Sequence, residues 1–327
     1  MRVCVIGAGA LGGTFGARLA MTGHAVTLVD RWAEHMAAVA RDGLHLDGIA
    51  GDHHVKMAAR TDTEGVTGQD LVLVATDANA TAAAAAAAAG VLAPEGVVLT
   101  VQNGIGNVEK LTAACGAARV LGGSTMSSFR TNGPGWVTLT HAGPTTIGEI
   151  DGADTPRLQR VAAAIAAAGF EVRTSPRIMA IIWEKFLLNL AINPLCAVTF
   201  LRLGEVARTP AMDRFQDLIL DEAFAVTRAK GLDLDVDAIR AKIKAHCWSK
   251  YSKPSMLQHM ERGVRTEIDA LNGALVREAA ALGLAAPCNE SLMLLVKGCE
   301  VYHARRAAGI ELDEAALEAA AARQART

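Results

Sequence analysis

The start of the chain constrains its fold more than any other segment. Residues 2–7, "RVCVIG", form a short apolar run that ends in glycine, as a buried parallel strand would. Apolar residues at helical spacing follow at Leu11, Phe15 and Leu19. The connection, "GAGALG" at residues 7–12, has the pattern G-x-G-x-x-G. A strand, this turn and a helix in that order predict a dinucleotide site, with the pyrophosphate at the helix N-terminus.

The predicted cofactor contacts are the residues of this turn and the residues at the end of the second strand. In the alternative interpretation, the glycines only allow the strand and helix to pack closely. At the second strand, Asp30 could accept from the ribose 2'-hydroxyl of NAD, whereas Arg31 could pair with the 2'-phosphate of NADP. Both residue types are present, so NADP(H) and NAD(H) both remain open. The turn residues are Gly7, Ala8, Gly9, Ala10, Leu11 and Gly12.

The first half of the chain alternates strand and helix signals. Apolar runs at residues 24–30, 70–76 and 96–104 predict three further strands. The alanine tract at residues 80–90 predicts a helix with Gly90 as its C-cap. This alternation is typical of a doubly wound α/β domain with a parallel sheet.

Later segments predict where this domain ends and which type of domain succeeds it. Residues 134–150 alternate in polarity between Gly and Pro turns, which predicts antiparallel strands on the sheet edge. A helix at about 156–168 and a strand at 170–175 would close the domain. The remainder reads as helix, and 327 residues are long for a single core. We therefore expect an α/β domain at residues 1–175 and an all-α domain at residues 176–327.

Composition excludes several classes of protein. A hydrophobic content of 51% with 20% charged residues describes an ordinary soluble chain, and a net charge of -2 without a basic stripe argues against nucleic acid or anionic membrane as a partner. We expect no apolar run of transmembrane length and a cytoplasmic location. The six cysteines are dispersed. His53 and His54 are adjacent and would face opposite sides of a strand, so no metal site is expected.

A polar stripe crosses the most apolar predicted helix. Residues 182–194, "IWEKFLLNLAINP", carry Lys185, Asn189 and Asn193 at spacings of four, which places all three on one helical face. A helix that is apolar on most sides should be buried. Because a buried charge is costly unless it is paired or used, Lys185 is a candidate functional residue.

Four features now occur together in one order. They are the glycine-rich turn, "VQNGIGN" at residues 101–107, the polar stripe, and "SMLQHMERGVRTEIDALNG" at residues 255–273. This combination resembles the ketopantoate reductase (2-dehydropantoate 2-reductase) family over nearly the whole chain. The resemblance implies a Rossmann-type N-terminal domain and a C-terminal domain like that of 6-phosphogluconate dehydrogenase. It also implies NADPH-dependent reduction of ketopantoate to pantoate, in pantothenate biosynthesis.

The resemblance also implies roles for individual residues. Lys185 would be the general acid that protonates the carbonyl oxygen, and Glu267 would hydrogen-bond near the lysine, the substrate and the nicotinamide ribose. Asn103 would place the nicotinamide against the substrate. A proton donor suits this chemistry because hydride transfer to a ketone builds negative charge on oxygen. The implied substrate contacts are Asn103, Asn189, Asn193 and Ser255.

Each residue also has a purely structural explanation. Lys185 could extend along apolar surface to solvent. Asn189 and Asn193 could be helix caps or interhelical hydrogen bonds, since Pro194 marks a break there. Glu267 could form a surface ion pair with Arg262 or Arg265. Asn103 could serve a turn, and Ser255 could be a helix N-cap.

The chain departs from the family pattern at three positions. Asp77 stands where the family commonly has a lysine, although it could cap the following helix. Leu203 stands where a polar substrate contact is common, and His259 where an acidic residue is usual. A different 2-oxo acid or a 3-hydroxy acid, handled by a related NAD(P)-dependent dehydrogenase, and a non-catalytic NADP(H)-binding sensor therefore remain alternatives. An apolar helical domain is also compatible with a homodimer.

Overall fold

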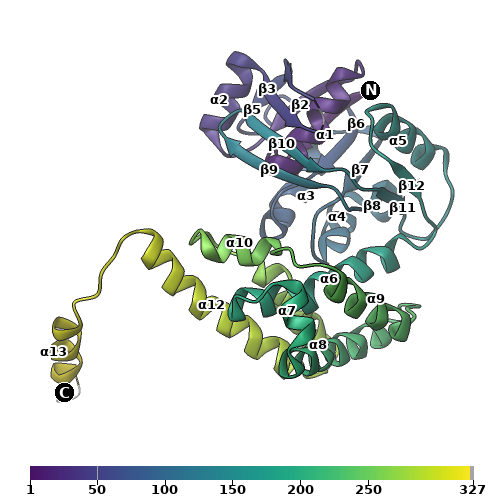
Figure 1. The fold of residues 1–327 in the computed structure, drawn as a ribbon. Helices are drawn as coiled ribbons and strands as arrows, with labels where there is room; N and C mark the ends of the chain where they lie inside the picture. The colour runs from purple at the N-terminus through teal and green to yellow at the C-terminus, as the bar shows by residue number, and fades with distance from the viewer. Residues whose placement is uncertain (50, 325–327) are drawn as a thin grey trace. The chain divides into compact units, whose positions relative to one another are not determined.

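The chain forms two compact units, residues 1–186 and 187–327. The computed structural model describes residues 1–49 and 51–324 (Figure 1). The division falls inside helix α6 (Ile178–Thr199), later than the predicted boundary at residue 175. The first turns of α6 belong to the first unit because Ile178 and Ile182 pack against Gly122 of the sheet.

The first unit is built on an eight-stranded sheet, as expected for a doubly wound α/β domain. Its strand order is β12-β11-β8-β7-β6-β1-β2-β5, and β11 is antiparallel to β8 whereas all other neighbours are parallel. The strands are β1 (Arg2–Ile6), β2 (Ala25–Val29), β5 (Ala58–Arg60), β6 (Gln69–Val74), β7 (Leu92–Thr100), β8 (Val120–Thr125), β11 (Thr145–Glu149) and β12 (Val172–Thr174). The helices are α1 (Ala10–Met21), α2 (Ala33–Asp42), α3 (Thr81–Val91), α4 (Asn107–Cys115) and α5 (Pro156–Ala167).

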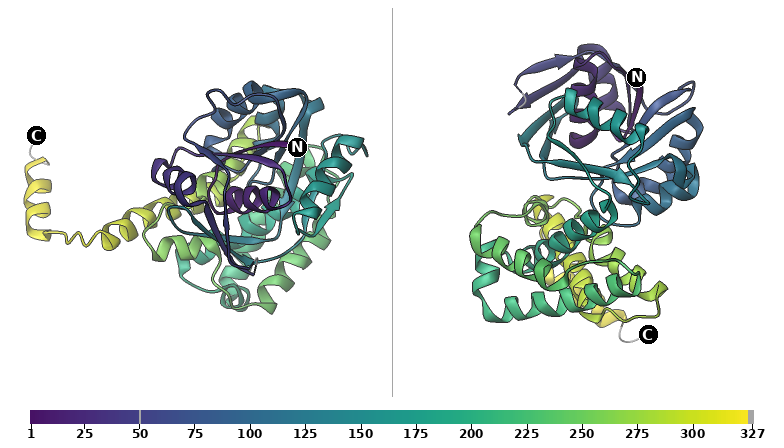
Figure 2. Two further views of the ribbon diagram at one scale, coloured as in Figure 1. Left: turned by 90° about the horizontal axis from the view of Figure 1, so that it is seen from above. Right: turned by 90° about the vertical axis from the view of Figure 1, so that its right-hand side faces the viewer.

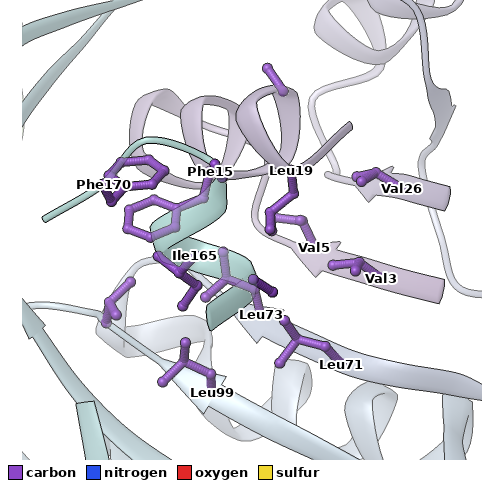
Figure 3. Packing of buried hydrophobic residues seen from close by; sticks show 14 of the residues in the cluster. Val3, Val5, Phe15, Leu19, Val26, Leu71, Leu73, Leu99, Ile165 and Phe170 are labelled. Atoms are coloured by element: carbon purple, nitrogen blue, oxygen red, sulfur yellow. The ribbon is translucent and has the colours of Figure 1, made fainter. Parts of the chain in front are cut away.

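The central strands are buried on both faces because helices cover the sheet. Leu71, Leu73 and Leu99 of β6 and β7 are at most 1% exposed. Figure 3 shows these side chains below α1 and α5, where Phe15 stacks on Phe170 with ring centroids 4.1 Å apart. Full burial explains why these strands read as continuous apolar runs in the sequence.

A second, four-stranded sheet has the order β4-β3-β10-β9. It consists of β3 (Leu44–Gly48), β4 (His53–Val55), β9 (Ser128–Gly133) and β10 (Trp136–His141). The prediction of antiparallel strands over residues 134–150 at the edge of the main sheet is wrong for β10, whereas β11 is antiparallel to β8 and lies next to the edge strand β12. Strand β10 pairs with β9 and with β3 because α1 offers a second apolar surface, where Leu44 and Val137 pack against Gly13.

Two helix ends differ from the sequence prediction. Helix α3 continues through Gly90 to Val91 and the chain enters β7 at once, so Gly90 is not its C-cap. Helix α6 continues through Pro194 to Thr199, so the break predicted there is wrong. Proline removes one helical hydrogen bond. Burial of the whole stretch from Leu190 to Ala197 compensates for that loss.

The described part of the second unit contains only helices, as the two views of Figure 2 show. An interior polar network joins them: the Asn272 amide donates to Asn289 Oδ1 (2.9 Å), and the Asn289 amide donates to Glu222 (2.7 Å). Beyond α6, these helices are α7 (Leu203–Arg208), α8 (Pro210–Ala229), α9 (Val236–Ser249), α10 (Ser255–Glu261), a 3₁₀ turn (Ile268–Ala270), α11 (Asn272–Ala281), α12 (Pro287–Ala307) and α13 (Glu314–Gln324).

Among the described residues, α6 is the one helix long and apolar enough to cross a membrane, judged by length and composition alone. The expectation that no apolar run reaches this length is therefore wrong. Of its most apolar window, 67% is buried inside the structure. Such burial is typical of the core helix of a soluble protein, so this helix is weak evidence for a membrane span.

Candidate active site

The three glycines of the first turn have three different environments. A side chain at Gly7, whose φ is +96°, would lie 2.5 Å from the Thr76 nitrogen at the end of β6. A side chain at Gly12 would lie 1.9 Å from the Gly7 carbonyl oxygen, whereas one at Gly9 would meet nothing within 4 Å. Gly7 and Gly12 therefore permit close packing, and Gly9 leaves open space. A dinucleotide-binding turn requires these same features, which are close packing at its first and third glycines and room for the pyrophosphate at its second.

The N-terminus of α1 is suited to an anion. No side chain caps the helix, and no acidic residue lies in its first turn, which begins at Ala10. The first N–H groups of a helix have no partner within the helix and carry partial positive charge. The residues of the turn therefore fit a pyrophosphate, which would be bound by main-chain N–H groups beside Gly9.

A carboxylate and a buried imidazole hold this turn in place. Ala8 N–H donates to Asp30 Oδ2 (2.8 Å), and Ala8 C=O accepts from His35 Nε2 (3.0 Å). The other ring nitrogen of His35 accepts from Gly135 N–H (2.8 Å), which fixes the tautomer with the proton on Nε2. Burial lowers the pKa of His35, against the smaller opposing effects of Ala8 and Asp30. This neutral histidine was not identified in the sequence.

Asp30 and Arg31 are used differently. The second carboxylate oxygen of Asp30 accepts from Trp32 N–H (3.0 Å), so each of its oxygens already binds a main-chain N–H. Arg31 is exposed and makes no hydrogen bond or ion pair among the described residues. At the end of β2, Asp30 thus binds the main chain, whereas the exposed Arg31 has no side-chain partner among the described residues.

Lys185 lies at the carboxyl edge of the main sheet. It is half-buried on α6, and its ammonium donates to Asn103 Oδ1 (2.9 Å) and to the Thr125 carbonyl oxygen at the end of β8 (2.6 Å). The structure therefore brings together two residues predicted 82 positions apart. The alternative that Lys185 only extends to solvent does not describe these contacts. In open parallel sheets, ligands bind at the carboxyl edge, and the glycine-rich turn after β1 lies on that same edge.

A buried glutamine supports the loop that carries Asn103. Gln102 is 8% exposed, and its amide donates to Thr76 O (2.6 Å) and to Thr81 Oγ1 (3.0 Å). Asn107 continues the network by donating to the Asn103 carbonyl oxygen (3.0 Å). Gln102 and Asn107 were part of the motif "VQNGIGN", but sequence reasoning gave them no role. The hydrogen bonds of Gln102 join the loop that follows β7 to the segment that follows β6, and that of Asn107 closes the loop on itself.

The other predicted substrate residues belong to the second unit. Asn189 is half-buried and Asn193 is 7% exposed, and both continue the face of α6 that begins with Lys185. Because α6 does not end at Pro194, neither asparagine is a helix cap. Ser255 is exposed at the first position of α10, whose N-cap is Pro254, so the capping explanation for Ser255 is wrong.

Glu267 is half-buried immediately before the 3₁₀ turn. Neither arginine considered as its partner binds it, since Arg265 pairs with Asp269 (3.1 Å) and Arg262 donates to the Gln258 carbonyl oxygen (3.1 Å). The surface ion pair offered as an alternative explanation is therefore not formed. The role of Glu267 at a substrate stays a prediction.

Comparison with known proteins identifies the family. A model for the ketopantoate reductase PanE/ApbA family matches residues 3–152, and the model for its C-terminal part matches residues 177–300. The chain belongs to the ketopantoate reductase family. The 2-dehydropantoate 2-reductase of Archaeoglobus fulgidus is 33% identical over 91% of this chain and 98% of its own.

Solved structures agree with this membership. A PanE/ApbA family ketopantoate reductase from Ralstonia eutropha JMP134 is 34% identical, with a TM-score of 0.83 over 93% of this chain and 99% of that one. D-mandelate dehydrogenase, solved with NADH and anilino(oxo)acetate, is 26% identical, with a TM-score of 0.81 over the same shares. The expected fold class, an α/β Rossmann-type domain followed by a helical domain, is confirmed.

Three positions depart from the ketopantoate reductase pattern, and the structure places each of them. Asp77 is exposed after β6, and its side chain does not cap the 3₁₀ turn that follows, so that explanation is wrong. Leu203 is 4% exposed at the start of α7 and is a core residue. His259 is half-buried on α10. Lys110 of α4 donates to the carbonyl oxygen of Ala78, the residue after Asp77 (3.4 Å).

Proposed function

We propose that this protein is an NAD(P)H-dependent oxidoreductase that reduces a 2-oxo acid to the 2-hydroxy acid, with ketopantoate as the first candidate substrate. The observation that carries the proposal is the position of the Lys185 ammonium. It is held by Asn103 and Thr125 on the sheet edge where the glycine-rich turn begins α1. The family's curated members named 2-dehydropantoate 2-reductase support the substrate, which places the reaction in pantothenate biosynthesis.

Each predicted site residue has a separate role in the reduction of the carbonyl group. The nicotinamide, when bound, supplies the hydride that reaches the carbonyl carbon. Lys185 donates a proton to the carbonyl oxygen, where negative charge develops, and Asn103 positions the ammonium by accepting one of its hydrogen bonds. Asn189 and Asn193 bind the hydroxyl and carbonyl groups of the substrate from the same face of α6. Ser255 binds its carboxylate, and Glu267 hydrogen-bonds to the substrate and the nicotinamide ribose.

We assign NADP(H) as the preferred cofactor. Both oxygens of Asp30 are occupied by the N–H groups of Ala8 and Trp32, which reduces its capacity to accept from a ribose hydroxyl. Arg31 is exposed beside it and could pair with a 2'-phosphate. NAD(H) stays an alternative because D-mandelate dehydrogenase, a structural relative, was solved with NADH.

The direct test measures the oxidation of NADPH and of NADH by the purified protein with ketopantoate and with a panel of other 2-oxo acids. We expect the highest kcat/KM with NADPH and ketopantoate. Oxidation of either cofactor at the same rate with and without every oxo acid would contradict the proposal. Tight cofactor binding without turnover would instead support a non-catalytic NADP(H)-binding sensor.

A second candidate substrate is a bulkier 2-oxo acid. The observation that favours it is the similarity to D-mandelate dehydrogenase. In the same panel, a higher kcat/KM with phenylglyoxylate than with ketopantoate would select this candidate.

We also propose that the protein is a cytoplasmic homodimer. Four large apolar side chains on α12 are 49% to 61% exposed, which is unusual for a surface helix in water. A second copy of the chain would cover them. Light scattering should give twice the chain mass, and a monomer at micromolar concentration would contradict the proposal. The four residues are Leu294, Leu295, Val301 and Tyr302.

A further inference from the structure

The second sheet carries a cluster of metal-binding side chains. In the β3–β4 hairpin His45 lies directly opposite His54 in the antiparallel register, and Leu46 lies opposite His53. Side chains alternate along a strand, so His45 and His54 share one face, and His53 shares the buried Leu46 face. The adjacent pair His53 and His54 is thus not the relevant pair. The histidine that accompanies His54 comes from the neighbouring strand.

Asp52 completes a set of three possible ligands. The ligand atoms of His45, Asp52 and His54 all lie within 4.8 Å of one another, and His45 Nε2 is 2.9 Å from Asp52 Oδ1. Two imidazole nitrogens and a carboxylate oxygen form a ligand set used for zinc, with a fourth position left to water. An ion bound there would take the place of the hydrogen bond between His45 and Asp52.

The ring of His45 is already oriented. It stacks on His54 with centroids 4.5 Å apart and planes at 6°, and its other neighbour is the indole of Trp136 at 5.2 Å. The indole is held in turn, since Trp136 Nε1 donates to Asp47 (2.9 Å). The side chain of His45 is 24% exposed and that of Asp52 is 77% exposed, so an ion in solution can reach them. Because imidazole lone pairs lie in the ring planes, one of the two parallel rings must rotate to bring both nitrogens to one ion, and the exposed His54 is the ring with room to do so.

We propose that His45, Asp52 and His54 form a binding site for a divalent transition-metal ion of the zinc class. The site is distinct from the residues assigned to catalysis. Oxygen-preferring ions such as Mg²⁺ would bind it poorly, because two of the three ligands are imidazoles.

Calorimetric titration of the untagged full-length protein with Zn²⁺ tests the proposal. We expect the wild type to bind one ion per chain. His54→Ala should lower the Zn²⁺ affinity at least about tenfold, because loss of even a residue that only hydrogen-bonds to a ligand can lower metal affinity by that factor. His53→Ala is the matched control, because this neighbour faces the other side of the strand, and it should bind as the wild type does. Equal Zn²⁺ affinity in the wild type and His54→Ala, or no binding by the wild type, would overturn the proposal.

A second readout uses the stacked indole. Cu²⁺ binds imidazole more strongly than Zn²⁺ does and quenches the fluorescence of an adjacent tryptophan. Cu²⁺ at a concentration that saturates the site should quench a component that is absent from Trp136→Phe and weakened in His54→Ala. Unchanged quenching in both variants would place the ion elsewhere and contradict the assignment. Asp52→Asn should reduce affinity less than loss of either histidine, since the amide retains one neutral oxygen ligand.

Discussion

At the scale of single residues, Lys185 is the side chain whose loss should affect chemistry most. Replacing it with methionine keeps the unbranched chain up to the ε position but removes the proton donor and the contact to Asn103. We expect kcat to fall by about 10² to 10⁴, the usual contribution of general acid catalysis, with little change in NADPH affinity. Stopped-flow turnover and fluorescence titration with NADPH would separate the two effects.

The matched control is Lys230→Met, because Lys230 pairs with Glu278 in the second unit and has no assigned role in catalysis. It should retain turnover. Retained turnover in Lys185→Met as well would remove Lys185 from the role of proton donor.

Arg31 should determine the choice of cofactor. Arg31→Ala removes an exposed guanidinium that we assign to the 2'-phosphate, so KM for NADPH should rise about tenfold, equivalent to about 1.4 kcal/mol. KM for NADH should change little, which makes NADH an internal control. Arg41→Ala is the external control, since Arg41 is an exposed arginine of α2 already paired with Asp42. Equal losses with both cofactors would show that Arg31 acts on binding in general.

At the scale of elements, helix α12 depends on a carboxylate from α8. Glu222 accepts from Cys288 N–H (2.8 Å) and Asn289 N–H (3.0 Å) at the start of α12, and from the Asn289 amide. Charge-assisted bonds at a helix N-terminus are stronger than neutral ones. Glu222→Ala should therefore lower the free energy of unfolding by about 2 to 4 kcal/mol in urea titrations.

The adjacent Asp221 provides the comparison. Its ion pair with Arg240 is 62% exposed on the aspartate side, and such pairs contribute about 1 kcal/mol or less. If Asp221→Ala destabilises the protein as much as Glu222→Ala does, the capping interpretation is wrong.

The same scale shows which elements the sequence could predict. The central strands were predictable because burial on both faces leaves an uninterrupted apolar run, as in β6. The second sheet was not, because β3 and β4 read "LHLDG" and "HHV", with polar residues on their exposed face. The pairing of β3 with β10 joins segments about ninety residues apart, and no local pattern specifies such a register.

Some residues of the candidate site could be predicted from the sequence, and others could not. The turn from Gly7 to Gly12 was predictable because each glycine has a separate steric reason. The family resemblance gave Lys185 and Asn103 their separate predicted roles, but their direct contact was found only in the structure. The Thr125 carbonyl oxygen could not have been found, since every residue has a carbonyl and only the fold selects one. His35 was missed because a lone histidine in a helix carries no distinguishing pattern.

At the scale of the whole molecule, burial of histidines should make stability depend on pH. Burial lowers the pKa of His35 and of His246, with Lys250 adding to the effect at His246. It also lowers the pKa of His24, together with the N-terminal ammonium. These groups stay neutral in the folded protein at pH values where the unfolded chain already binds protons, below about 6.5. The free energy of unfolding should therefore fall as pH decreases through that range, by up to about 1.4 kcal/mol per pH unit for each proton.

Urea titrations between pH 7.5 and 5.5 would measure this dependence. His35→Gln should give a flatter profile, because the amide can donate and accept as the imidazole does but does not titrate in this range. A profile in His35→Gln as steep as that of the wild type would exclude His35 as a contributor.

The imidazole of His35 has a mechanical consequence as well. It joins the carbonyl oxygen of Ala8 to the main chain of Gly135, which lies 100 residues beyond His35, and Gly135 in turn accepts from His45 N–H (2.8 Å). The glycine-rich turn and the β9–β10 hairpin, which are far apart in the sequence, are thus connected through one side chain. We therefore expect the motion of the predicted nucleotide-binding turn to be limited by that of the hairpin, so that the turn is largely formed before a ligand binds.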